Sequence, residues 1–421
     1  MIQTYLLSAG ITLRCCRDTR FKQGCLSFQI IRPMAASENA MNALLPSVLL
    51  RGTKAHPDLR AITHRLDELY GASVSAVVRR VGDYQTTGLY CGFMDDRFAL
   101  PGDRVLEPML DFLRELLLDS PVEADGFLPA FVESEKKNLI ATIESELNDK
   151  RAYAMGRLLR TMCREDTFGL PRLGDKEQVA AIDAAMLYRH YQKILRESPI
   201  EIFYVGSAEG EQVGSLLKPL LSHLERNYVN SNPQTGFHSC DGSDLTETME
   251  VSQGKLCMGF VSPITNRMPE FPAMQVLNTI FGSGMTSKLF MNIREKMSLC
   301  YSIGSGYYGT KGIVTVSAGI DFDKEELTRR EVLRQLAACQ HGDITDEELT
   351  AARQAILSSL RATHDSPGAI EGYYATAALS GMKLTPMEYM AAVEAVTKEQ
   401  VVAAANSLKL HTTYFLKGGS Q

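Results

Sequence analysis

Several patterns that mark familiar functional classes are missing from this chain of 421 residues. It has no run of Lys and Arg interleaved with aromatic residues, and its net charge of -6 creates no field that attracts phosphate backbones, so nucleic-acid binding is not expected. Its apolar runs are broken by Pro or Gly and fall far short of the ~20 residues that cross a bilayer. No basic segment precedes a long apolar one at the N-terminus. These absences predict a soluble protein with no signal peptide and no membrane contact.

Common enzyme motifs are also missing. The nine cysteines are odd in number, scattered and without a CxxC pair, which favours a reducing compartment, with the cytoplasm as the expected location. No GxSxG is present, and the Gly-Ser-Gly at 282–284 lacks the Lys-Ser/Thr of a phosphate-binding loop. No two of the eight histidines lie within four residues of each other. His64 and Glu68 share a helical face, but no third ligand is visible, so an exposed helix face is favoured over a metal site.

The residues that are present indicate an ordinary globular chain. A composition with 45% hydrophobic and 22% charged residues suits two domains of about 200 residues each. The stretches "GITLRCCRD" and "CLSFQIIRP" predict strands paired around the turn "TRFKQG", and "SVSAVVRRVGDYQTTGLYCGF" predicts a second strand pair. Helices are predicted over residues 39–50, 105–118 and 127–147, and "IEIFYVG" is typical of a buried strand.

The chain also carries signs of an internal repeat. "IFYVG" at 202–206 recurs as "TYFLKG" at 413–418, and two stretches, 112–143 and 332–360, share a helix, turn, helix layout. The polar stretch "VNSNPQTGFHSCDGSD" has linker composition. We therefore predict an N-terminal domain over 1–220, a linker over 221–245 and a C-terminal domain over 246–421. Each is predicted to be an α+β unit, a mainly antiparallel sheet with helices packed on it.

One stretch of the second half, "FGSGMTSKLFMNIREKMSLCYS", combines a glycine-containing loop, an apolar helical stripe and a strand. Gly282 and Gly284 flank Ser283 where a backbone can approach another molecule closely. Arg294 lies near the expected end of the helix, and Tyr301 lies in the strand that follows, which is open to an extended peptide by β-augmentation. Spacing alone favours a structural interpretation, a helix-ending arginine stabilised by the helix dipole and an ordinary strand tyrosine.

The same stretch resembles the pitrilysin/insulinase family of zinc metallopeptidases, in which a glycine-containing loop, an "SxLF" helix and an "REKxxLxY" ending recur. "LLRGT", "LDELYGA" and "ESEKKNLIATIESELNDKRAYA" fit the family too, so the likeness covers nearly the whole chain, and it extends to the bacterial YmfF-like noncatalytic branch. The resemblance implies two homologous domains of insulinase or mitochondrial-processing-peptidase type. It implies that Arg294 and Tyr301 contact the substrate backbone and support the developing oxyanion, and that Gly282, Ser283 and Gly284 bind substrate.

The metal site that the family implies is not found in this sequence. Catalytic members carry HxxEH just before a Gly-Thr pair, with two histidines for zinc and a glutamate as general base. Counted back from the Gly-Thr at 52–53, the corresponding stretch is residues 43–47. Ala43 and Ser47 stand at the two histidine positions, and Pro46 stands at the glutamate position. Proline inside a helix costs ~3 kcal/mol and is expected to bend the segment.

A third zinc ligand of the family would fall at Thr142 or Glu144, depending on register. A lone glutamate holds no catalytic zinc, so no metal is expected in this chain. A metal enzyme built on His64 and unseen ligands would require one zinc ion per chain.

Two functions are compatible with these residues. In the first, the chain is inactive alone and is the noncatalytic subunit of a heterodimeric zinc endopeptidase, supplying Arg294 and Tyr301 to a partner whose HxxEH holds the zinc, with a peptide or unfolded protein as substrate. In the second, it is a peptidase-fold scaffold or peptide-binding protein with no role in proteolysis.

Overall fold

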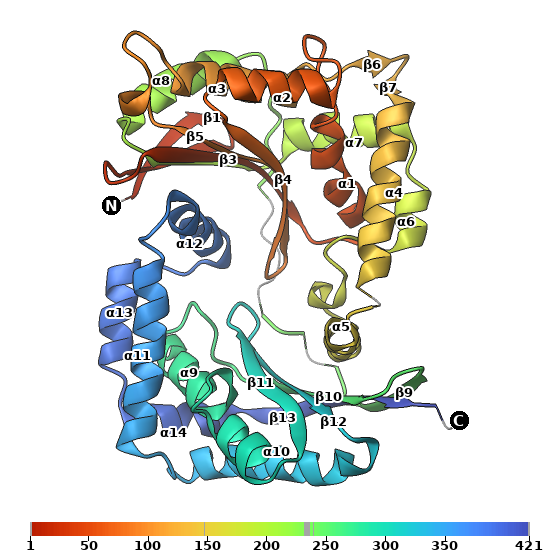
Figure 1. Cartoon of the computed structure of the whole chain (residues 1–421), viewed down its shortest axis with the longest axis vertical. Coiled ribbons are helices and arrows are strands. Elements are labelled where there is room, and N and C mark those ends of the chain that lie inside the picture. The colour runs from red at the N-terminus through yellow and green to blue at the C-terminus, as the bar shows by residue number, and fades with distance from the viewer. Residues whose placement is uncertain (1, 147, 231–235, 239, 420–421) are drawn as a thin grey trace. The chain divides into compact units, whose positions relative to one another are not determined.

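The computed structural model describes residues 2–146, 148–230, 236–238 and 240–419, and these form two compact units (Figure 1). The first unit comprises Met1–Glu144, Leu170–Gln234 and His364–Thr376; the second comprises Ser145–Gly169, Thr235–Thr363 and Ala377–Gln421. Each half of the chain thus gives one segment to the unit built mainly from the other half. Positions 231–235 and 239 of the predicted linker, and Leu147 of the helix predicted over 127–147, lie outside the described residues. The division at 1–220, 221–245 and 246–421 stays a prediction.

The first unit is built on a six-stranded sheet in which only the β2–β8 pair is parallel. In spatial order its strands are β1 (Ile2–Ser8), β2 (Ile11–Arg17), β8 (Ile200–Gly206), β3 (Gln23–Pro33), β5 (Tyr84–Met94) and β4 (Ser73–Val81). The predicted pairing of β4 with β5 is confirmed. The predicted pairing of β2 with β3 is wrong, because β8 lies between them and pairs with both. A strand as completely buried as β8 needs a neighbour on each edge, which a local turn pattern does not reveal.

The second unit repeats this topology in a five-stranded sheet. Its strands, in spatial order, are β11 (Cys300–Tyr308), β12 (Ile313–Ile320), β10 (Gly254–Val261), β13 (Lys409–Gly418) and β9 (Asp244–Met249). Read from the β11 edge, this order matches β4, β5, β3, β8 and β2 of the first sheet, and the parallel pair β13–β9 matches β8–β2. The predicted α+β class is therefore confirmed, with mainly antiparallel sheets.

Helices pack on these sheets. The first unit contains α1 (Asn39–Leu49), α2 (Leu59–Glu68), α3 (Leu106–Leu118), α4 (Pro129–Ser145), α6 (Lys176–Ala180), α7 (Ala184–Glu197) and α8 (Gly210–Leu221), with the two-stranded ribbon β6 (Val122–Glu123) and β7 (Gly126–Phe127). The second contains α5 (Lys150–Met162), α9 (Phe271–Asn278), α10 (Glu325–Gln340), α11 (Asp346–Ala362), α13 (Pro386–Glu394) and α14 (Lys398–Ser407). Helix α12 (Pro367–Ser380) begins in the first unit and ends in the second. None of the helices in the described residues is both long and apolar enough to span a membrane.

Helix α12 is fastened to the first sheet by a buried carboxylate. The two terminal nitrogens of Arg79 each donate a hydrogen bond of 2.8 Å to the Glu371 carboxylate. The same carboxylate accepts hydrogen bonds from Ser27 Oγ at 2.6 Å and Gln29 Nε2 at 2.9 Å. Such a bidentate, charge-assisted contact compensates the cost of burying the charge. The polar face of β3 and β4 is thus covered by a segment that comes from the second half of the chain.

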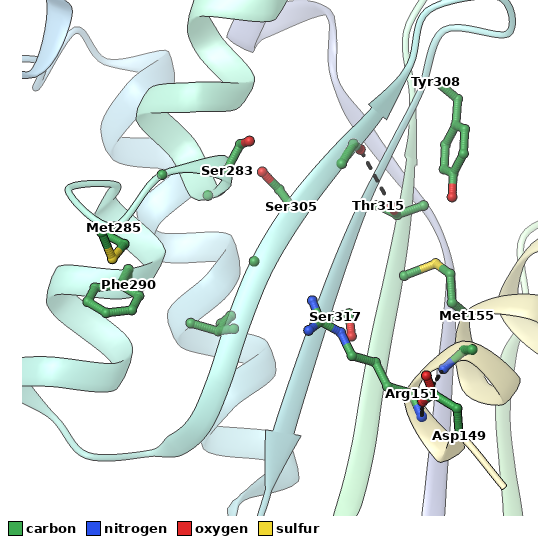
Figure 2. A pocket seen from close by; sticks show the side chains of 16 residues that line it. Asp149, Arg151, Met155, Ser283, Met285, Phe290, Ser305, Tyr308, Thr315 and Ser317 are labelled. Atoms are coloured by element: carbon green, nitrogen blue, oxygen red, sulfur yellow. Dashed lines mark hydrogen bonds between the residues drawn. The ribbon is translucent and has the colours of Figure 1, made fainter. Parts of the chain in front are cut away.

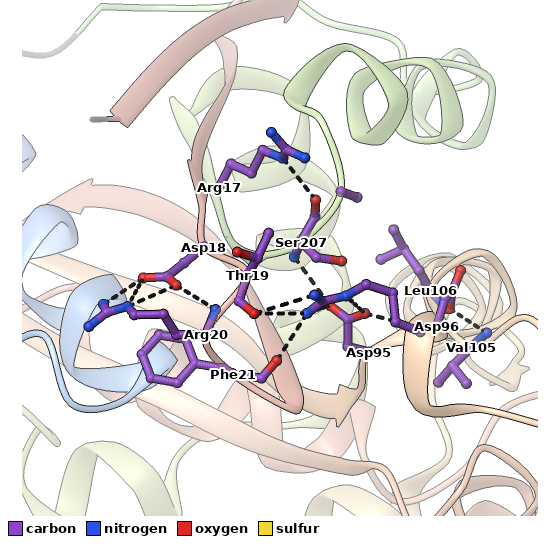
Figure 3. A network of polar contacts seen from close by, with 12 residues as sticks. Arg17, Asp18, Thr19, Arg20, Phe21, Asp95, Asp96, Val105, Leu106 and Ser207 are labelled. Carbon is purple, nitrogen blue, oxygen red and sulfur yellow. Dashed lines mark hydrogen bonds and ion pairs between the residues drawn. The ribbon is translucent and has the colours of Figure 1, made fainter.

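Another polar network ties together the loops at one end of the first sheet (Figure 3). Arg97 donates to the carboxylate of Asp95 at 2.8 Å and to the backbone carbonyl of Phe21 at 3.2 Å. Asp95 also accepts the backbone N–H of Ser207, and Asp96 accepts two N–H groups at the start of α3. These contacts fix three loops that are distant in sequence.

In the second unit, α5 lies on the sheet. Ala154 and Leu158 of this helix share a buried cluster with Cys257 of β10 and Tyr414 of β13. Asp149 is the N-cap that precedes this helix, and its carboxylate accepts the backbone N–H groups of residues 151 and 152 at 3.0 Å each. Such an N-cap supplies acceptors for donors that the first helical turn leaves unpaired. The start of α5 lines a cavity together with residues of β11 and β12.

Candidate functional site

The segment that carries the predicted site is not a regular α-helix. It contains two π-helical segments, η3 (Thr279–Ser283) and η4 (Leu289–Lys296), and the N–H of Met297 bonds to the carbonyl of Asn292, five residues earlier. π-Helical turns are rare and occur frequently at functional sites. The predicted helix over this stretch is therefore present in a wider, irregular form.

Gly282 is required by close packing at the end of η3. A Cβ at this position would lie 2.6 Å from Leu289 Cδ1 and 2.7 Å from Ser305 Oγ, distances that a side chain cannot reach without displacing its neighbours. At Gly284 the nearest described atom to such a Cβ is 3.8 Å away, so this position has space for one. Only the first glycine of the predicted loop is therefore demanded by its surroundings.

Arg294 lies in η4 with its side chain 41% exposed. Its guanidinium stacks over the Phe290 ring, with 4.6 Å between the Cζ atom and the ring centroid, and one nitrogen lies 3.7 Å from the Glu295 carboxylate. Stacking on an aromatic ring orients the guanidinium plane and leaves its N–H groups at the edge of that plane. Arg294 therefore has donors directed away from the ring.

Tyr301 occupies a β-bulge. In the β11–β12 pair, Cys300 is opposite Ile320 and Ser302 is opposite Gly319, so Tyr301 is the extra residue of β11. Bulges turn a side chain out of the regular alternation and are frequent next to active sites. The Tyr301 ring is accordingly exposed, at 62%.

The phenol of Tyr301 donates a hydrogen bond to Asp321 Oδ1 at 3.0 Å, and Lys324 Nζ lies 2.7 Å from Asp321 Oδ2. The hydrogen bond to Asp321, together with the negative charge of that carboxylate, raises the pKa of the Tyr301 phenol. Arg294, Tyr301, Asp321 and Lys324 line one cavity of about 380 Å³. The structure thus brings the two predicted residues to the same cavity, and it adds a carboxylate and an ammonium that their spacing in the sequence gave no sign of.

A second cavity, of about 610 Å³, contains the predicted glycine loop (Figure 2). Gly282, Ser283 and Gly284 line it from one side, and the start of α5 lines it from another, with Arg151 directed into it. Its other lining residues come from α5, β11, β12 and η4 and include Asp149, Met155, Met285, Phe290, Gly304, Gly306, Thr315 and Ser317. Residues 149–155 were not predicted to belong to this site: the stretch that ends at Ala154 fits the family, but it lies in the other half of the sequence and gave no sign of which cavity it would line.

The three positions that replace the family's metal ligands and base lie on α1. Ala43 is buried, with 5% of its surface exposed, Pro46 is buried inside the helix and Ser47 is half-buried. Pro46 has no N–H, so the carbonyl of Asn42 lacks its helical donor. The hydroxyl of Thr87 donates to that carbonyl instead, at 2.6 Å. The helix therefore continues through Pro46 to its end at Leu49.

A buried polar network lies beside this part of α1. The Asn42 amide donates to Gln85 Oε1 at 2.9 Å, and its Oδ1 lies 2.7 Å from His190 Nε2. Because the amide oxygen is the acceptor, His190 Nε2 must carry a proton in this arrangement. Burial lowers the pKa of His190 to about 4, so the imidazole is neutral at pH 7. These side chains bond to one another and form a structural network.

The candidate third ligands do not complete a metal site in the described residues. Thr142 donates to the carbonyl of Asn138, and Glu144 lies 3.4 Å from the ammonium of Lys176. His64 and Glu68 form an exposed pair at 3.2 Å. Within the described ranges, no group of three or more His, Cys, Asp or Glu side chains is placed to hold a metal ion. The described residues at the positions of the family's ligands therefore do not fit a catalytic zinc.

Known proteins match this chain over its full length. A family model described as "Peptidase M16 inactive domain" matches residues 181–356. A protein of Bacillus subtilis (strain 168) named "Probable inactive metalloprotease YmfF" is 31% identical over 409 residues, covering 97% of this chain and 96% of that protein. This chain belongs to the M16 peptidase family. The predicted membership of the pitrilysin/insulinase family is thereby confirmed. The family model is described as an inactive domain and the Bacillus subtilis protein as a probable inactive metalloprotease, which is consistent with a noncatalytic role.

Solved structures show the same M16 fold. A conserved protein from Enterococcus faecalis V583 has a TM-score of 0.93 and 26% identity, covering 100% of this chain and 99% of that one. A peptidase M16 inactive domain from Pseudomonas fluorescens has a TM-score of 0.81 and 18% identity, covering 100% and 98%. The two-sheet topology is therefore that of M16 proteins.

Proposed function

We propose that this chain is the noncatalytic subunit of a heterodimeric zinc endopeptidase, and that it supplies peptide-binding and oxyanion-supporting residues to an M16 partner with an intact HxxEH motif. The observation that supports this most directly is the placement of Arg294 and Tyr301 on one cavity by two backbone irregularities, a π-helical segment and a β-bulge. Such irregularities weaken regular hydrogen bonding and are frequent at functional sites. The zinc is assigned to the partner because Ala43, Pro46 and Ser47 offer no ligand.

In this proposal Arg294 donates to a carbonyl oxygen of the bound peptide and stabilises negative charge that develops on it. A guanidinium suits this role because it stays protonated and offers several N–H groups. Strand β11 pairs with β12 alone among the described strands, so its outer edge can accept an extended peptide. The Gly282–Gly284 loop lies along the adjoining cavity and lets the peptide come close.

A second function is favoured by one contact. The Tyr301 hydroxyl donates its hydrogen bond to Asp321 in this chain. It can donate to a substrate oxygen only if the hydrogen bond to Asp321 breaks. A chain that binds peptides with no role in proteolysis needs no such donor. The two functions differ in what Tyr301 contributes once a catalytic partner is present.

Reconstitution separates them. The chain is mixed with an HxxEH-bearing M16 subunit encoded in the same genome, and cleavage of a quenched fluorescent peptide is measured. We expect no cleavage by this chain alone, cleavage by the mixture, and a loss of about 100-fold in kcat/KM for Arg294→Ala, the usual effect of removing an oxyanion donor. Tyr301→Phe is expected to lower kcat as well.

Two matched controls are available in the same chain. Arg330→Ala removes an exposed arginine of α10, and Tyr228→Phe removes the hydroxyl of an exposed tyrosine of the first unit. Mixtures that contain either control variant should cleave the peptide at the wild-type rate. Unchanged cleavage by the Arg294→Ala/Tyr301→Phe double variant would show that the pair takes no part in catalysis. Peptide binding with no cleavage in any mixture would instead support the second function.

A further inference from the structure

We propose that the 610 Å³ cavity at the start of α5, here called the α5 cavity, binds a peptide segment that carries a carboxylate next to an apolar side chain, and that Arg151 selects the carboxylate. The inference rests on the proposed function for the peptide nature of the ligand, and it adds a chemical preference that the family likeness does not assign. Arg151, a glycine floor and an exposed apolar wall carry it (Figure 2).

Arg151 has the features of a residue that receives an anion. It is exposed, its side chain is directed into the α5 cavity, and no ion pair joins it to a carboxylate in the part of the chain that the structure describes. The nearby carboxylate of Asp149 accepts two backbone N–H groups as the N-cap of α5. Lys255 does not line the α5 cavity; together with Arg151 and Glu250 it lines a neighbouring cavity, so charges of both signs lie near the guanidinium there.

The floor of the α5 cavity is suited to a main chain. Gly304 and Gly306 of β11 leave the sheet surface bare; a Cβ on either would have its nearest described neighbour at 3.5 Å. Thr315 and Ser317 of β12 also line this floor, although they are only 3% and 6% exposed and the Thr315 hydroxyl lies 3.5 Å from the Gly306 carbonyl. An extended segment can therefore lie close to the sheet over Gly304 and Gly306.

The wall opposite α5 is apolar and exposed. Met285 has 78% of its surface accessible, the largest value among the exposed large hydrophobic residues of the described chain, and Phe290 lies beside it in the cavity lining. Met291 and Met297 in the same segment are also exposed, at 40% and 39%. Methionine is flexible and polarisable and is common on surfaces that bind varied apolar partners. Met291 and Met297 lie outside the cavity lining, so Met285 and Phe290 are the residues of this wall that offer a contact for an apolar side chain.

The two walls together define the ligand. A peptide over the glycine floor has the Arg151 guanidinium on one side and the Met285 thioether with the Phe290 ring on the other, so a carboxylate and an apolar side chain each face a complementary surface. The carboxylate can belong to an Asp or Glu side chain or to the C-terminus of the peptide, and both sources offer Arg151 the same bidentate geometry.

Binding to the isolated full-length chain tests this. Fluorescein-labelled peptides that differ only by Glu or Gln at one central position, each flanked by Leu and amidated at the C-terminus, are titrated by fluorescence anisotropy. We expect the Glu peptide to bind about fivefold more tightly, since a partly exposed ion pair contributes on the order of 1 kcal/mol, and the difference to shrink in 0.5 M NaCl. A Gln peptide with a free C-terminal carboxylate in place of the amide tests the second carboxylate source.

Arg151→Gln should abolish the Glu preference and leave Gln-peptide binding unchanged, whereas Arg160→Gln, at an exposed arginine of the same helix outside the cavity lining, should keep it. Met285→Ser should weaken binding of both peptides. Far-UV circular dichroism confirms that each variant is folded. Equal binding of the two peptides by the wild type, or a Glu preference that survives Arg151→Gln, would overturn the assignment of Arg151 while leaving peptide binding intact. No binding of any peptide would overturn the proposed peptide-holding function itself.

Discussion

His190 provides a pH-dependent test of the polar network beside α1. The imidazole is 8% exposed and is bonded to Asn42, and burial lowers its pKa from the usual 6.5 to about 4. The folded protein therefore binds fewer protons at this site than the unfolded chain between these two values. Stability from the neutral imidazole is complete above pH 6.5 and is lost as the pH falls toward 4.

The size of this effect follows from the pKa difference. Each pKa unit corresponds to about 1.4 kcal/mol, so the free energy of unfolding should fall by about 2 kcal/mol at pH 5 and about 3 kcal/mol at pH 4 from this group alone. His190 is buried, so little of the effect is screened by solvent. His190→Gln can still donate to Asn42 but does not titrate, and it should remove this part of the pH dependence.

Urea unfolding at pH 7 and pH 5, followed by far-UV circular dichroism, is the suitable assay because the chain contains no tryptophan. Between pH 7 and pH 5, the free energy of unfolding of the wild type should fall by about 2 kcal/mol more than that of His190→Gln. His64→Gln, at an exposed histidine, should behave as the wild type does. NMR of histidine-labelled protein should show one imidazole that stays neutral down to pH 5. Parallel losses of stability in the wild type and His190→Gln would refute a depressed pKa at this site.

Two further substitutions test buried contacts. The Lys311 ammonium lies 2.9 Å from the carboxylate of Asp166, whose side chain is 1% exposed. Lys311→Met should lower the free energy of unfolding by about 3–5 kcal/mol, because it leaves this buried carboxylate without its cation. A loss below about 1 kcal/mol in urea unfolding would contradict this expectation. Thr87→Val should cost about 1–3 kcal/mol by leaving the Asn42 carbonyl without a donor, and the cost should fall in a Pro46→Ala background that restores the helical N–H. A double-mutant cycle with no coupling between positions 46 and 87 would show that the hydroxyl does not compensate for the proline.

The sequence predicts local elements well and distant pairings poorly in this protein. The β4–β5 pair and the buried strand β8 follow from residue alternation and apolar runs, which depend on neighbouring residues alone. The position of β8 between β2 and β3 depends on a segment more than a hundred residues away, so a hairpin was the natural but incorrect prediction. The placement of α5 on the second sheet likewise has no local signal, since its apolar face fits any sheet of suitable shape.

The candidate site shows the same contrast. Gly282, Arg294 and Tyr301 could be named from a motif, because the motif records residue types at fixed spacing. The bulge that turns Tyr301 outward arises from one residue more in β11 than in β12, which only the register reveals. The contact with Asp321 depends on that bulge, and the lining by Arg151 depends on α5. These features come from tertiary structure, and spacing in one sequence does not contain them.

The change in α1 goes beyond the loss of three side chains. Pro46 removes a backbone donor, and Thr87 of the neighbouring strand supplies the replacement, so the helix and the sheet have been adjusted to each other. Ala43 is buried at 5% exposure, where an imidazole would have to displace close-packed neighbours, and the amide of Asn42 is held by two partners. Among the described residues Ala43, Pro46 and Ser47 of this helix offer no zinc ligand, so the proposed function assigns the metal to a partner chain.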